Sequence, residues 1–407
     1  MKSELNKNDV AKKGKAKKKL TLRQKLIVVL GTILCLLIIV FASAYGVFLH
    51  YYNKMNITSP NDDTQIVTAI DYEEDDINES ELTEEERQQL EQLFEEANAS
   101  SEDGDGETKE DEKDKNAGDK KDADTASSDD AASVDTSVIT DNKNVTNILL
   151  VGTDSRQKGN KRARTDTMII LSIDKKNKKM TMTSVLRDTY VSIPGVGKNR
   201  LNSAFVYGGP NLLFKTFKTN FDISLNRYVQ VDFFNFVKLV DVVGGVDLKL
   251  TPAEIKVMNK TYIPYINKYL NKSKSANLVK QNKSGTYHLN GIQALAYSRV
   301  RYVGTDFART ERQRKVIGQI IKKTKGMSVS ELNKLADVVL PMLSTNLTKG
   351  EVMSLIMNAK EYLNYKMVNG RMPIDGSYKY MKVRGASVLG VNFDKNKKYW
   401  YNLVYGK

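Results

Sequence analysis

The chain contains three segments that differ in their pattern of apolar and polar residues, and each pattern predicts a different kind of structure. Residues 26–49 contain no Asp, Glu, Lys or Arg and are long enough to cross a bilayer as one helix. Residues 61–142 contain few apolar positions, so this segment cannot bury enough apolar area to offset the entropy of ordering it. Within it, only residues 84–97 show a short amphipathic pattern that predicts a helix. From about residue 145 onward, short apolar runs bounded by turns predict a folded domain.

The folded domain is predicted to be of the α/β class. Runs of strand length occur at 147–153, 167–174, 179–186, 227–231 and 246–250. Only four polar residues join the second run to the third, which favours a hairpin. Helices are predicted at 210–220, 233–242 and 347–362, and a last strand or two after them. This alternation of strands and helices is typical of a layered α/β domain.

The net charge of +14 is distributed over the chain in three blocks. Residues 1–25 carry +8, residues 61–142 carry −24 and residues 143–407 carry +29. Lysines directly before an apolar span indicate that the N-terminus stays in the cytoplasm and that the rest of the chain is exported. A cleaved signal peptide is the alternative, because Ala42 and Ala44 resemble a cleavage site. The acidic segment is best interpreted as a self-repelling, extended spacer.

Several classes of catalytic site are excluded by composition. The single cysteine, Cys35, falls within the apolar span and leaves no cysteine cluster for a metal or a disulfide. Two histidines, His50 and His288, form no zinc-binding helix motif and make a histidine-based triad improbable. The chain also lacks a phosphate-binding P-loop and a Gly-rich dinucleotide motif. Any enzyme chemistry must therefore depend on carboxylates, arginines and a bound metal.

The predicted hairpin brings charged residues together at one end. Its turn lies at the opposite end, so Asp166, before one strand, and Arg187 with Asp188, after the other, are expected to be neighbours. Asp154, directly after the first strand, and Arg164 would join them if the loop between them is local. Ligands of open α/β sheets bind beyond such strand ends. Surface salt bridges in turns are the alternative interpretation.

A second charged cluster lies further along the chain. We expect Arg299 and Arg301 to lie on an extended segment, with roughly 7 Å between residues on the same side. The helix that follows, through Lys323, is predicted to turn one stripe inward and to leave Thr310, Arg314 and Lys315 off it. That stripe is polar in its first half, which indicates either a lined pocket or a solvated helix start. Its members are Arg309, Arg312, Gln313, Val316 and Ile320.

This set of residues suits an anionic, oxygen-rich ligand. Guanidinium groups bind phosphate oxygens in a bidentate manner. A pair of carboxylates such as Asp154 and Asp166 can hold Mg²⁺ or Mn²⁺ beside a substrate phosphate. A hard cation and arginines around a diphosphate would stabilise the charge that develops in phosphoryl transfer.

Five motifs in order resemble those of the LytR-CpsA-Psr family. They are NILLVGTDSR, RTDTMIILSID, SVLRDTYVSIPG, NRLNSAFVYGG and YSRVRYVGTDFARTERQR, over about residues 145–325. The resemblance implies a three-layer α/β/α sandwich with a central mixed sheet, preceded by one transmembrane helix and, in this chain, a disordered acidic linker. It also implies a Mg²⁺-dependent phosphotransferase at the outer face of a Gram-positive membrane. Such enzymes move an anionic glycopolymer, such as wall teichoic acid or capsule, from polyprenyl diphosphate to peptidoglycan.

The resemblance also assigns roles to individual residues. The metal ligands would be Asp154 and Asp166, and Asp188 and Asp306 would support the site. Catalysis would rest on Asp154, Arg187, Arg299 and Arg301. The diphosphate would bind to Arg164, Arg187, Arg299, Arg301, Arg309, Arg312 and Gln313, together with Lys198 or Arg200, of which either could fill the family's basic position.

The predicted organisation has five parts. They are a basic cytoplasmic head at 1–25, an anchor at 26–49, an extracellular acidic linker at 50–142, the catalytic domain at 143–325 and C-terminal helices and strand at 326–407 that complete it. Two alternative functions stay open, a polyprenyl diphosphate hydrolase and a non-catalytic surface binder of anionic glycopolymer. A nucleic-acid partner is not expected, because the only cytoplasmic segment is too short to fold.

Overall fold

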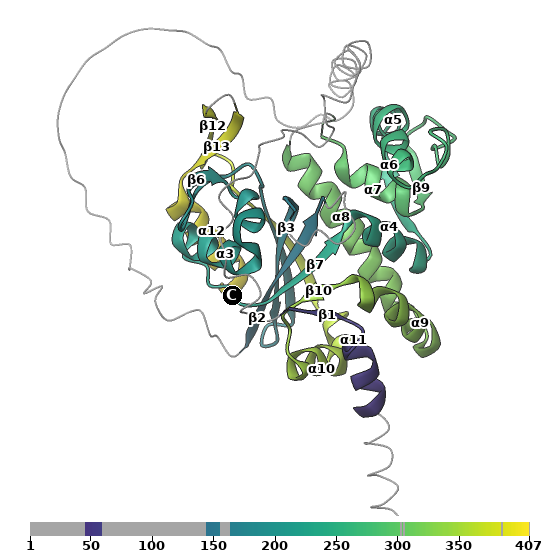
Figure 1. Ribbon diagram of the computed structural model, residues 1–407, viewed down its shortest axis with the longest axis horizontal. Helices are drawn as coiled ribbons and strands as arrows, with labels where there is room; N and C mark the ends of the chain where they lie inside the picture. The colour runs from purple at the N-terminus through teal and green to yellow at the C-terminus, as the bar shows by residue number, and fades with distance from the viewer. Residues whose placement is uncertain are drawn as a thin grey trace, which may run out of the picture. The chain divides into compact units, whose positions relative to one another are not determined.

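The structure, a computed structural model, describes residues 45–58, 144–154, 163–301, 303, 306–383 and 386–406. Its centre is a seven-stranded mixed sheet in the order β1-β10-β7-β2-β3-β4-β11 (Figure 1). β3 lies between β2 and β4 and is antiparallel to both. β7 pairs parallel to β2, and β11 pairs parallel to β4. The strands are β1 (Asn56–Ile57), β2 (Val145–Thr153), β3 (Thr165–Asp174), β4 (Lys179–Val185), β7 (Tyr228–Asp232), β10 (Ser344–Thr345) and β11 (Lys366–Met372).

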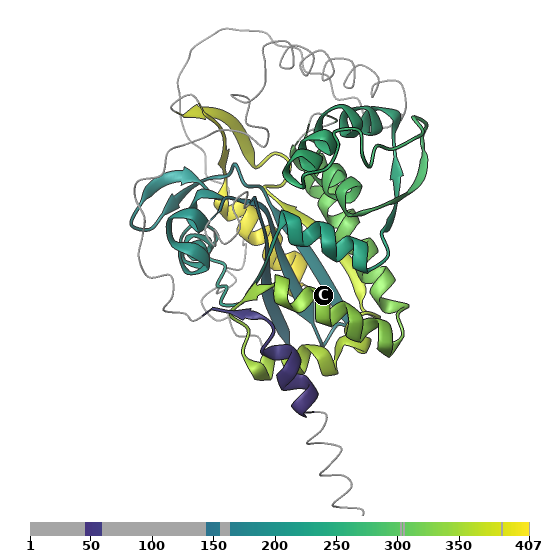
Figure 2. The same ribbon diagram turned by 45° about the vertical axis from the view of Figure 1, so that its right-hand side comes forward.

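The predicted strands are confirmed, as is the hairpin between β3 and β4. β3 and β4 are buried at nearly every position, polar residues included, because helices cover both faces of the sheet. On one face, Met168 and Ile170 share a core with α3 (Ser203–Phe221) and α12 (Phe393–Tyr405). On the other face, α8 (Asp306–Lys325) packs against β4 and β11 (Figure 2). The α/β class with a mixed central sheet is therefore confirmed.

A separate apolar core lies within a group of helices beside the sheet. It contains α4 (Phe233–Val242), α5 (Pro252–Val257), α6 (Ile263–Tyr269) and α7 (Gly291–Arg299), with a π-helical turn at Met258–Tyr262 and the hairpin of β8 (Val246–Leu250) and β9 (Gly285–Leu289). α7 crosses α4 so closely that a Cβ atom on Gly291 would lie 2.0 Å from the Val237 carbonyl oxygen. Only glycine fits at this crossing, and it sets where α7 and its last residue, Arg299, lie.

The C-terminal quarter of the chain supplies one edge strand of the sheet, β11, the strand β10 next to the other edge, and one covering helix. The predicted helix at 347–362 is two helices, α10 (Lys349–Met357) and α11 (Ala359–Tyr362), which are separated at Asn358. Sequence reasoning missed α9 (Val329–Val339), α12 and β11. The predicted last strand or two are confirmed as β12 (Tyr378–Val383) and β13 (Ala386–Val391), which form a hairpin of their own. A second small hairpin joins β5 (Tyr190–Ile193) to β6 (Gly197–Arg200).

The sequence predicted that the acidic linker begins at residue 50, and this start is wrong. Residues from Tyr52 onward belong to the folded unit, and β1 pairs with β10 in the central sheet. The Tyr52 hydroxyl donates to the Leu347 carbonyl at 3.2 Å, and the Thr58 hydroxyl lies 2.7 Å from that of Tyr228. The chain between Thr58 and β2 therefore leaves one sheet and returns to the same sheet. It is an insertion between two strands and does not link the domain to the segment before it.

The predicted anchor cannot be judged from the described residues. Residues 45–52 are helical, while 26–44 lie outside the described ranges. In the part of the chain that the structure describes, no helix is long and apolar enough to cross a membrane. The helix predicted at 84–97 and the basic head at 1–25 also fall outside the described residues.

Candidate active site at the sheet edge

Charged side chains meet where β3 begins and β4 ends. Arg187 Nη1 lies 2.6 Å from Asp166 Oδ1, and Arg187 Nε lies 3.5 Å from Asp188 Oδ2. The side chains of Arg187 and Asp166 are only 10% and 8% exposed, so this pair is not a surface salt bridge. The hairpin geometry therefore places these residues together, as the sequence predicted. They line a small cavity with Arg309, Thr310 and Gln313.

Asp154 and Asp166 flank one pair of bonded residues. Thr153 at the end of β2 pairs with Thr165 at the start of β3, beside a bulge, and the Asp154 amide donates to the Arg164 carbonyl at 3.2 Å. Asp166 is the extra residue of this bulge, because Gly152 pairs with Thr167 and Thr153 with Thr165.

The donor set fits a hard divalent cation only in part. Among the described residues, no three Asp, Glu, His or Cys side chains gather closely enough to form a metal site. Two carboxylates and an incoming phosphate oxygen would instead share the cation, which is how Mg²⁺ is commonly bound beside phosphates. The site thus fits a metal that binds together with its substrate.

Arg299 approaches the same edge from the helical group. We expected an extended segment here, but Arg299 is the last residue of α7. Asn290 and Gln293 form a reciprocal capping box that starts this helix, and the apolar residues after them continue it. The 7 Å spacing expected for Arg299 and Arg301 therefore does not apply. Arg301 lies two residues beyond the helix end and is half-buried.

Aromatic rings fix the Arg299 guanidinium. Its central carbon lies 4.3 Å from the centre of the Phe233 ring and 5.6 Å from that of Tyr265. Its Nη2 lies 3.6 Å from Asp154 Oδ2, and the residue is 5% exposed. Stacking of this kind orients a guanidinium plane before any ligand arrives. Sequence reasoning missed both rings, because nothing in the local sequence connects them to Arg299.

The polar stripe of α8 is buried, as predicted, but its arginines have different partners. Arg309 Nη2 donates to the Asp166 carbonyl at 2.8 Å, so Arg309 belongs to the charged edge. Gln313, one helical turn further along α8, has its Nε2 3.5 Å from the Ser298 carbonyl oxygen. The solvated helix start is excluded, since Arg309 is 3% exposed and Gln313 8%.

Arg312 is occupied by protein partners. Its Nε lies 2.8 Å from Glu254 Oε1, and its Nη1 and Nη2 donate to the carbonyls of Val300 and Val303 at 2.9 and 2.5 Å. Glu254 also closes the capping box at the start of α5. Arg312 therefore joins α8, α5 and the chain after α7, whereas its neighbour on the stripe, Arg309, reaches the charged edge.

The buried face of α8 is wider than predicted. Thr310 and Arg314, expected off the stripe, are 7% and 9% exposed, because α8 lies between the sheet and the helical group. Arg314 Nη1 donates to Ser184 Oγ on β4 at 2.6 Å. Burial lowers the pKa of the Arg314 guanidinium. Lys315 is off the buried face, as expected, and pairs with Glu311 at 2.9 Å.

The remaining candidates are placed at different depths. Arg200 Nε lies 3.5 Å from Asp188 Oδ1, whereas Lys198 is exposed two residues further out on β6. The structure thus favours Arg200 as the basic residue of this hairpin. Arg164 is half-buried where the chain enters β3. The side chain of Asp306 lies outside the described residues.

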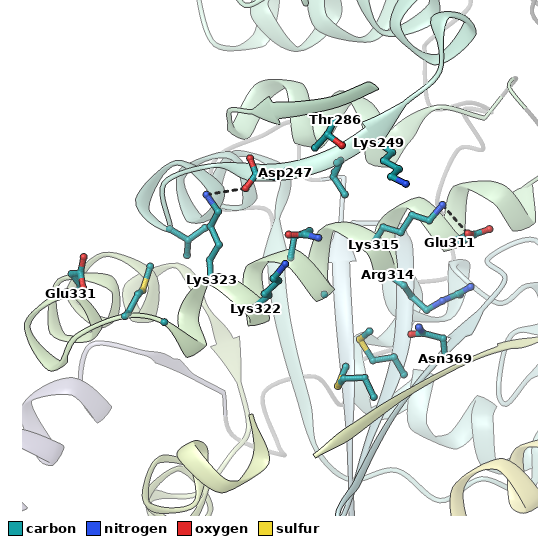
Figure 3. Close-up of a pocket in the computed structure, with 18 residues that line it drawn as sticks. Asp247, Lys249, Thr286, Glu311, Arg314, Lys315, Lys322, Lys323, Glu331 and Asn369 are labelled. Atoms are coloured by element: carbon teal, nitrogen blue, oxygen red, sulfur yellow. Dashed lines mark ion pairs between the residues drawn. The ribbon is translucent and has the colours of Figure 1, made fainter. Parts of the chain in front are cut away.

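A groove of about 1280 Å³ starts one helical turn along α8 from this edge (Figure 3). Arg314 separates the two, because it lines the groove while its Nη1 lies 3.5 Å from the Thr310 hydroxyl of the small cavity. The groove's apolar residues come from the sheet, the end of α4, β8 and the segment after α8. They are Met182, Val243, Leu248, Met327 and Met367.

Charged residues surround the groove, and half of them are lysines. Figure 3 shows the Lys323–Asp247 pair, at 3.7 Å, and the Lys315–Glu311 pair as separate ion pairs along its length. The His288 side chain hydrogen-bonds to Asp247 at 2.7 Å and lowers the pKa of that carboxyl. Long lysine side chains can cover apolar surface with their stems while the ammonium stays in water. The groove therefore combines an apolar interior with a charged rim.

Comparison with known proteins identifies the family. Residues 105–404 match the model of the LytR_cpsA_psr family, about three quarters of the chain. The protein belongs to this family. The resemblance read from the five sequence motifs is thereby confirmed.

Individual family members show the same relationship. The regulatory protein MsrR of Staphylococcus aureus is 32% identical over 254 residues, which cover 62% of this chain and 72% of MsrR. TagU of Enterococcus faecalis, named a polyisoprenyl-teichoic acid–peptidoglycan teichoic acid transferase, is 31% identical over 245 residues, 59% of this chain and 72% of TagU. Among solved structures, TagT bound to LI-WTA is 26% identical with a TM-score of 0.51 and covers 65% of this chain and 92% of TagT. The protein gbs0355 of Streptococcus agalactiae gives a TM-score of 0.53 at 25% identity, over 65% of this chain and 89% of its own.

Proposed function

We propose that this protein transfers an anionic glycopolymer, such as wall teichoic acid or capsule, from polyprenyl diphosphate to peptidoglycan. The observation that carries the proposal is the buried set of Asp154, Asp166, Arg187, Arg299 and Arg309 at one sheet edge, with a long, partly apolar groove beside it. An enzyme for a lipid-linked diphosphate needs both features together. The names of TagU and of the TagT complex support this donor class.

The charged edge would hold the diphosphate. Arg187 follows the end of β4 and Arg299 ends α7, so the two guanidinium groups come from different elements. In the reaction, the acceptor hydroxyl oxygen attacks the phosphorus on the glycopolymer side, and the bond to the bridging oxygen breaks. Polyprenyl phosphate leaves with the bonding electron pair and takes up the proton that the hydroxyl releases. Fixed guanidinium groups would stabilise the charge that grows on these oxygens.

A divalent cation, Mg²⁺ or Mn²⁺, is proposed at Asp154 and Asp166. When bound there it would neutralise phosphate charge and act as a Lewis acid. Asp166 also fixes Arg187, and Asp154 faces Arg299, so each carboxylate would connect the cation to a phosphate-binding arginine. Asp188 and Arg200 would support Arg187 from the outer side. The contacts of Arg312 support a structural role for it instead of diphosphate binding.

The groove is proposed to hold the polyprenyl tail. Gly318 lies on its α8 wall, and a Cβ atom there would meet nothing within 4 Å. Gly318→Leu should therefore place a side chain in the groove without disturbing the helix. We expect it to raise KM for a long-chain donor about tenfold, because it displaces several methylene groups of the tail from apolar contact, and to leave a short-chain donor unaffected.

Gly350→Leu provides the matched control. Gly350 also lies in a helix, α10, and also has open space around its Cβ position, but it does not line the groove. It should leave KM unchanged for both donors. If Gly318→Leu and Gly350→Leu had equal effects on KM, the proposal that the polyprenyl tail lies in this groove would be refuted.

The decisive experiment uses purified full-length protein with a synthetic polyprenyl diphosphate donor, with and without peptidoglycan. Transfer predicts polyprenyl phosphate release together with polymer bound to peptidoglycan. Hydrolysis would release polyprenyl phosphate at the same rate with or without acceptor. A non-catalytic binder would retain the donor intact. Asp154→Asn should reduce turnover in either enzymatic case.

The topology is part of the proposal. We infer a single-pass membrane protein with its N-terminus in the cytoplasm and the catalytic domain outside, because lysines precede the apolar residues 26–49. Protease added to intact protoplasts should degrade the domain and leave a small anchored fragment. Survival of the full-length chain under those conditions would exclude this topology.

A further inference from the structure

Aromatic side chains form a continuous row from the first turn of α8 to the exposed hairpin of β12 and β13. The Arg371 guanidinium lies 4.0 Å from the centre of the Phe307 ring. The Phe307 and Tyr378 rings are 5.0 Å apart, and those of Tyr378 and Tyr380 are 5.7 Å apart and nearly perpendicular. Tyr380, at the outer end, is 61% exposed. Phe307 and Arg309 both lie in the first turn of α8, so the row begins on the helix that supplies one residue of the charged edge.

Backbone bonds fix the hairpin to that edge. The Leu389 amide of β13 donates to the Asp188 carbonyl at 2.9 Å, and Leu389 bridges to Thr189. Arg200, which pairs with Asp188, donates to the Ser387 carbonyl at 2.8 Å. Tyr380 lies directly opposite Leu389 on β12. Two strand spacings, about 10 Å, therefore separate the Tyr380 backbone from Thr189, a distance comparable to the length of a disaccharide.

We propose that the row of Phe307, Tyr378 and Tyr380 binds the glycan strand of the peptidoglycan acceptor. The assignment rests on the transferase function proposed above and names where its second substrate lies. Pyranose rings have an apolar face of C–H groups that packs on aromatic rings, and a tyrosine hydroxyl can bond the polar edge. Lys382 is exposed on the same face of β12 as Tyr378 and Tyr380 and would attract the carboxylates of peptidoglycan stems.

A membrane surface is the competing partner for exposed tyrosine, methionine and lysine. The alternation of the strand argues against it, because Tyr380 and Met381 point to opposite faces of the hairpin. Met381, 37% exposed, crosses Gly390 on the face away from Tyr380. Neither face therefore presents a broad apolar patch that could enter a bilayer. An aromatic row that leads to the catalytic edge fits a strand-shaped polar ligand better.

The test measures binding of undecorated, solubilised glycan strands to the full-length protein in detergent, with no donor present. Tyr380→Ala should raise the Kd at least about tenfold, the effect typical of removing one stacking ring. Tyr380→Phe should retain the ring and stay within about threefold. Met381→Ala, the control on the opposite face, should change neither glycan binding nor donor turnover.

Three results would overturn the assignment. They are a wild-type protein that does not bind glycan strands, a Tyr380→Ala variant with wild-type Kd, and a Tyr380→Ala variant that loses binding to phospholipid vesicles but keeps glycan binding. The last would assign the hairpin to the membrane. Because the binding assay contains no donor, its outcome is independent of turnover. Glycan binding that follows the prediction, in a protein that does not turn over donor, would retain this surface and refute only the transferase.

Discussion

The replacement of Arg299 by alanine probes the proposed diphosphate site most directly. Arg299 is 5% exposed, stacks on Phe233 at 4.3 Å and faces Asp154 at 3.6 Å. Its guanidinium is therefore already oriented in the absence of substrate. Alanine removes the charge, the donors and the stacking plane at once, while lysine restores only the charge.

Two magnitudes follow from this geometry. The loss of one preorganised donor at a charge that develops in the transition state costs about 3 kcal/mol, or more than a hundredfold in kcat. The loss of the stacked guanidinium should lower the free energy of unfolding by only about 1–2 kcal/mol. Activity should thus fall far more than stability. Arg299→Lys should recover little activity, since an ammonium cannot form the planar fork.

The assay is single-turnover release of polyprenyl phosphate at saturating Mg²⁺, with urea denaturation of each variant beside it. Phe233→Leu is the control, because it removes one stacking ring and leaves the guanidinium and Asp154 in place. We expect an intermediate loss of activity from it. An Arg299→Ala variant that turns over donor within about threefold of wild type would refute the role of the guanidinium. Full activity of Arg299→Lys would refute the role of the fork.

Three further predictions concern the frame around the site. Arg312→Ala should lower the free energy of unfolding in urea by about 3–5 kcal/mol, because it leaves Glu254 buried without its partner. A variant with normal stability that no longer binds donor would show instead that Arg312 binds the diphosphate. Lys218 and Lys397 lower the pKa of Asp222, so the stability it contributes is present above its unfolded pKa of about 3.9 and is lost as the pH falls through the lower folded value. Asp222→Asn should therefore lower the free energy of unfolding by about 1 kcal/mol at pH 7 and leave it unchanged near pH 2, as measured by thermal melts. An equal loss at both pH values would contradict a stabilising role of the Asp222 ion pairs. Replacing the inserted segment 61–140 by a short Gly-Ser linker should keep the fold. A chain that starts at 141 and lacks β1 should lose about 2–4 kcal/mol of the free energy of unfolding, since it loses the buried Tyr52 and Met55. Equal unfolding midpoints of the two variants would show that β1 does not stabilise the fold.

The sequence by itself determined four strands of the central sheet, β2, β3, β4 and β7, and part of the site. The apolar runs of β2, β3 and β4 are bounded by clear turns, and the tight connection between β3 and β4 places Asp166 beside Arg187 and Asp188. These relations are local along the chain, so strand pattern and turn length are sufficient to predict them. The inward stripe of α8 and the five motifs are equally local signals. The sequence analysis did not use the capping box of Asn290 and Gln293, which begins the helix that it took for an extended segment.

The tertiary structure alone decided which arginine does what and where the chain before the acidic segment belongs. Arg309 and Arg312 lie on the same stripe one turn apart, yet Arg309 meets Asp166, 143 residues away, and Arg312 meets Glu254, 58 residues away. β1 is too short to show a pattern of its own and is fixed by β10, more than 280 residues later. Helical and strand periodicity specify only which face of an element is buried. What that face contacts depends on the packing of distant segments, and that packing separates a substrate-binding arginine from a structural one.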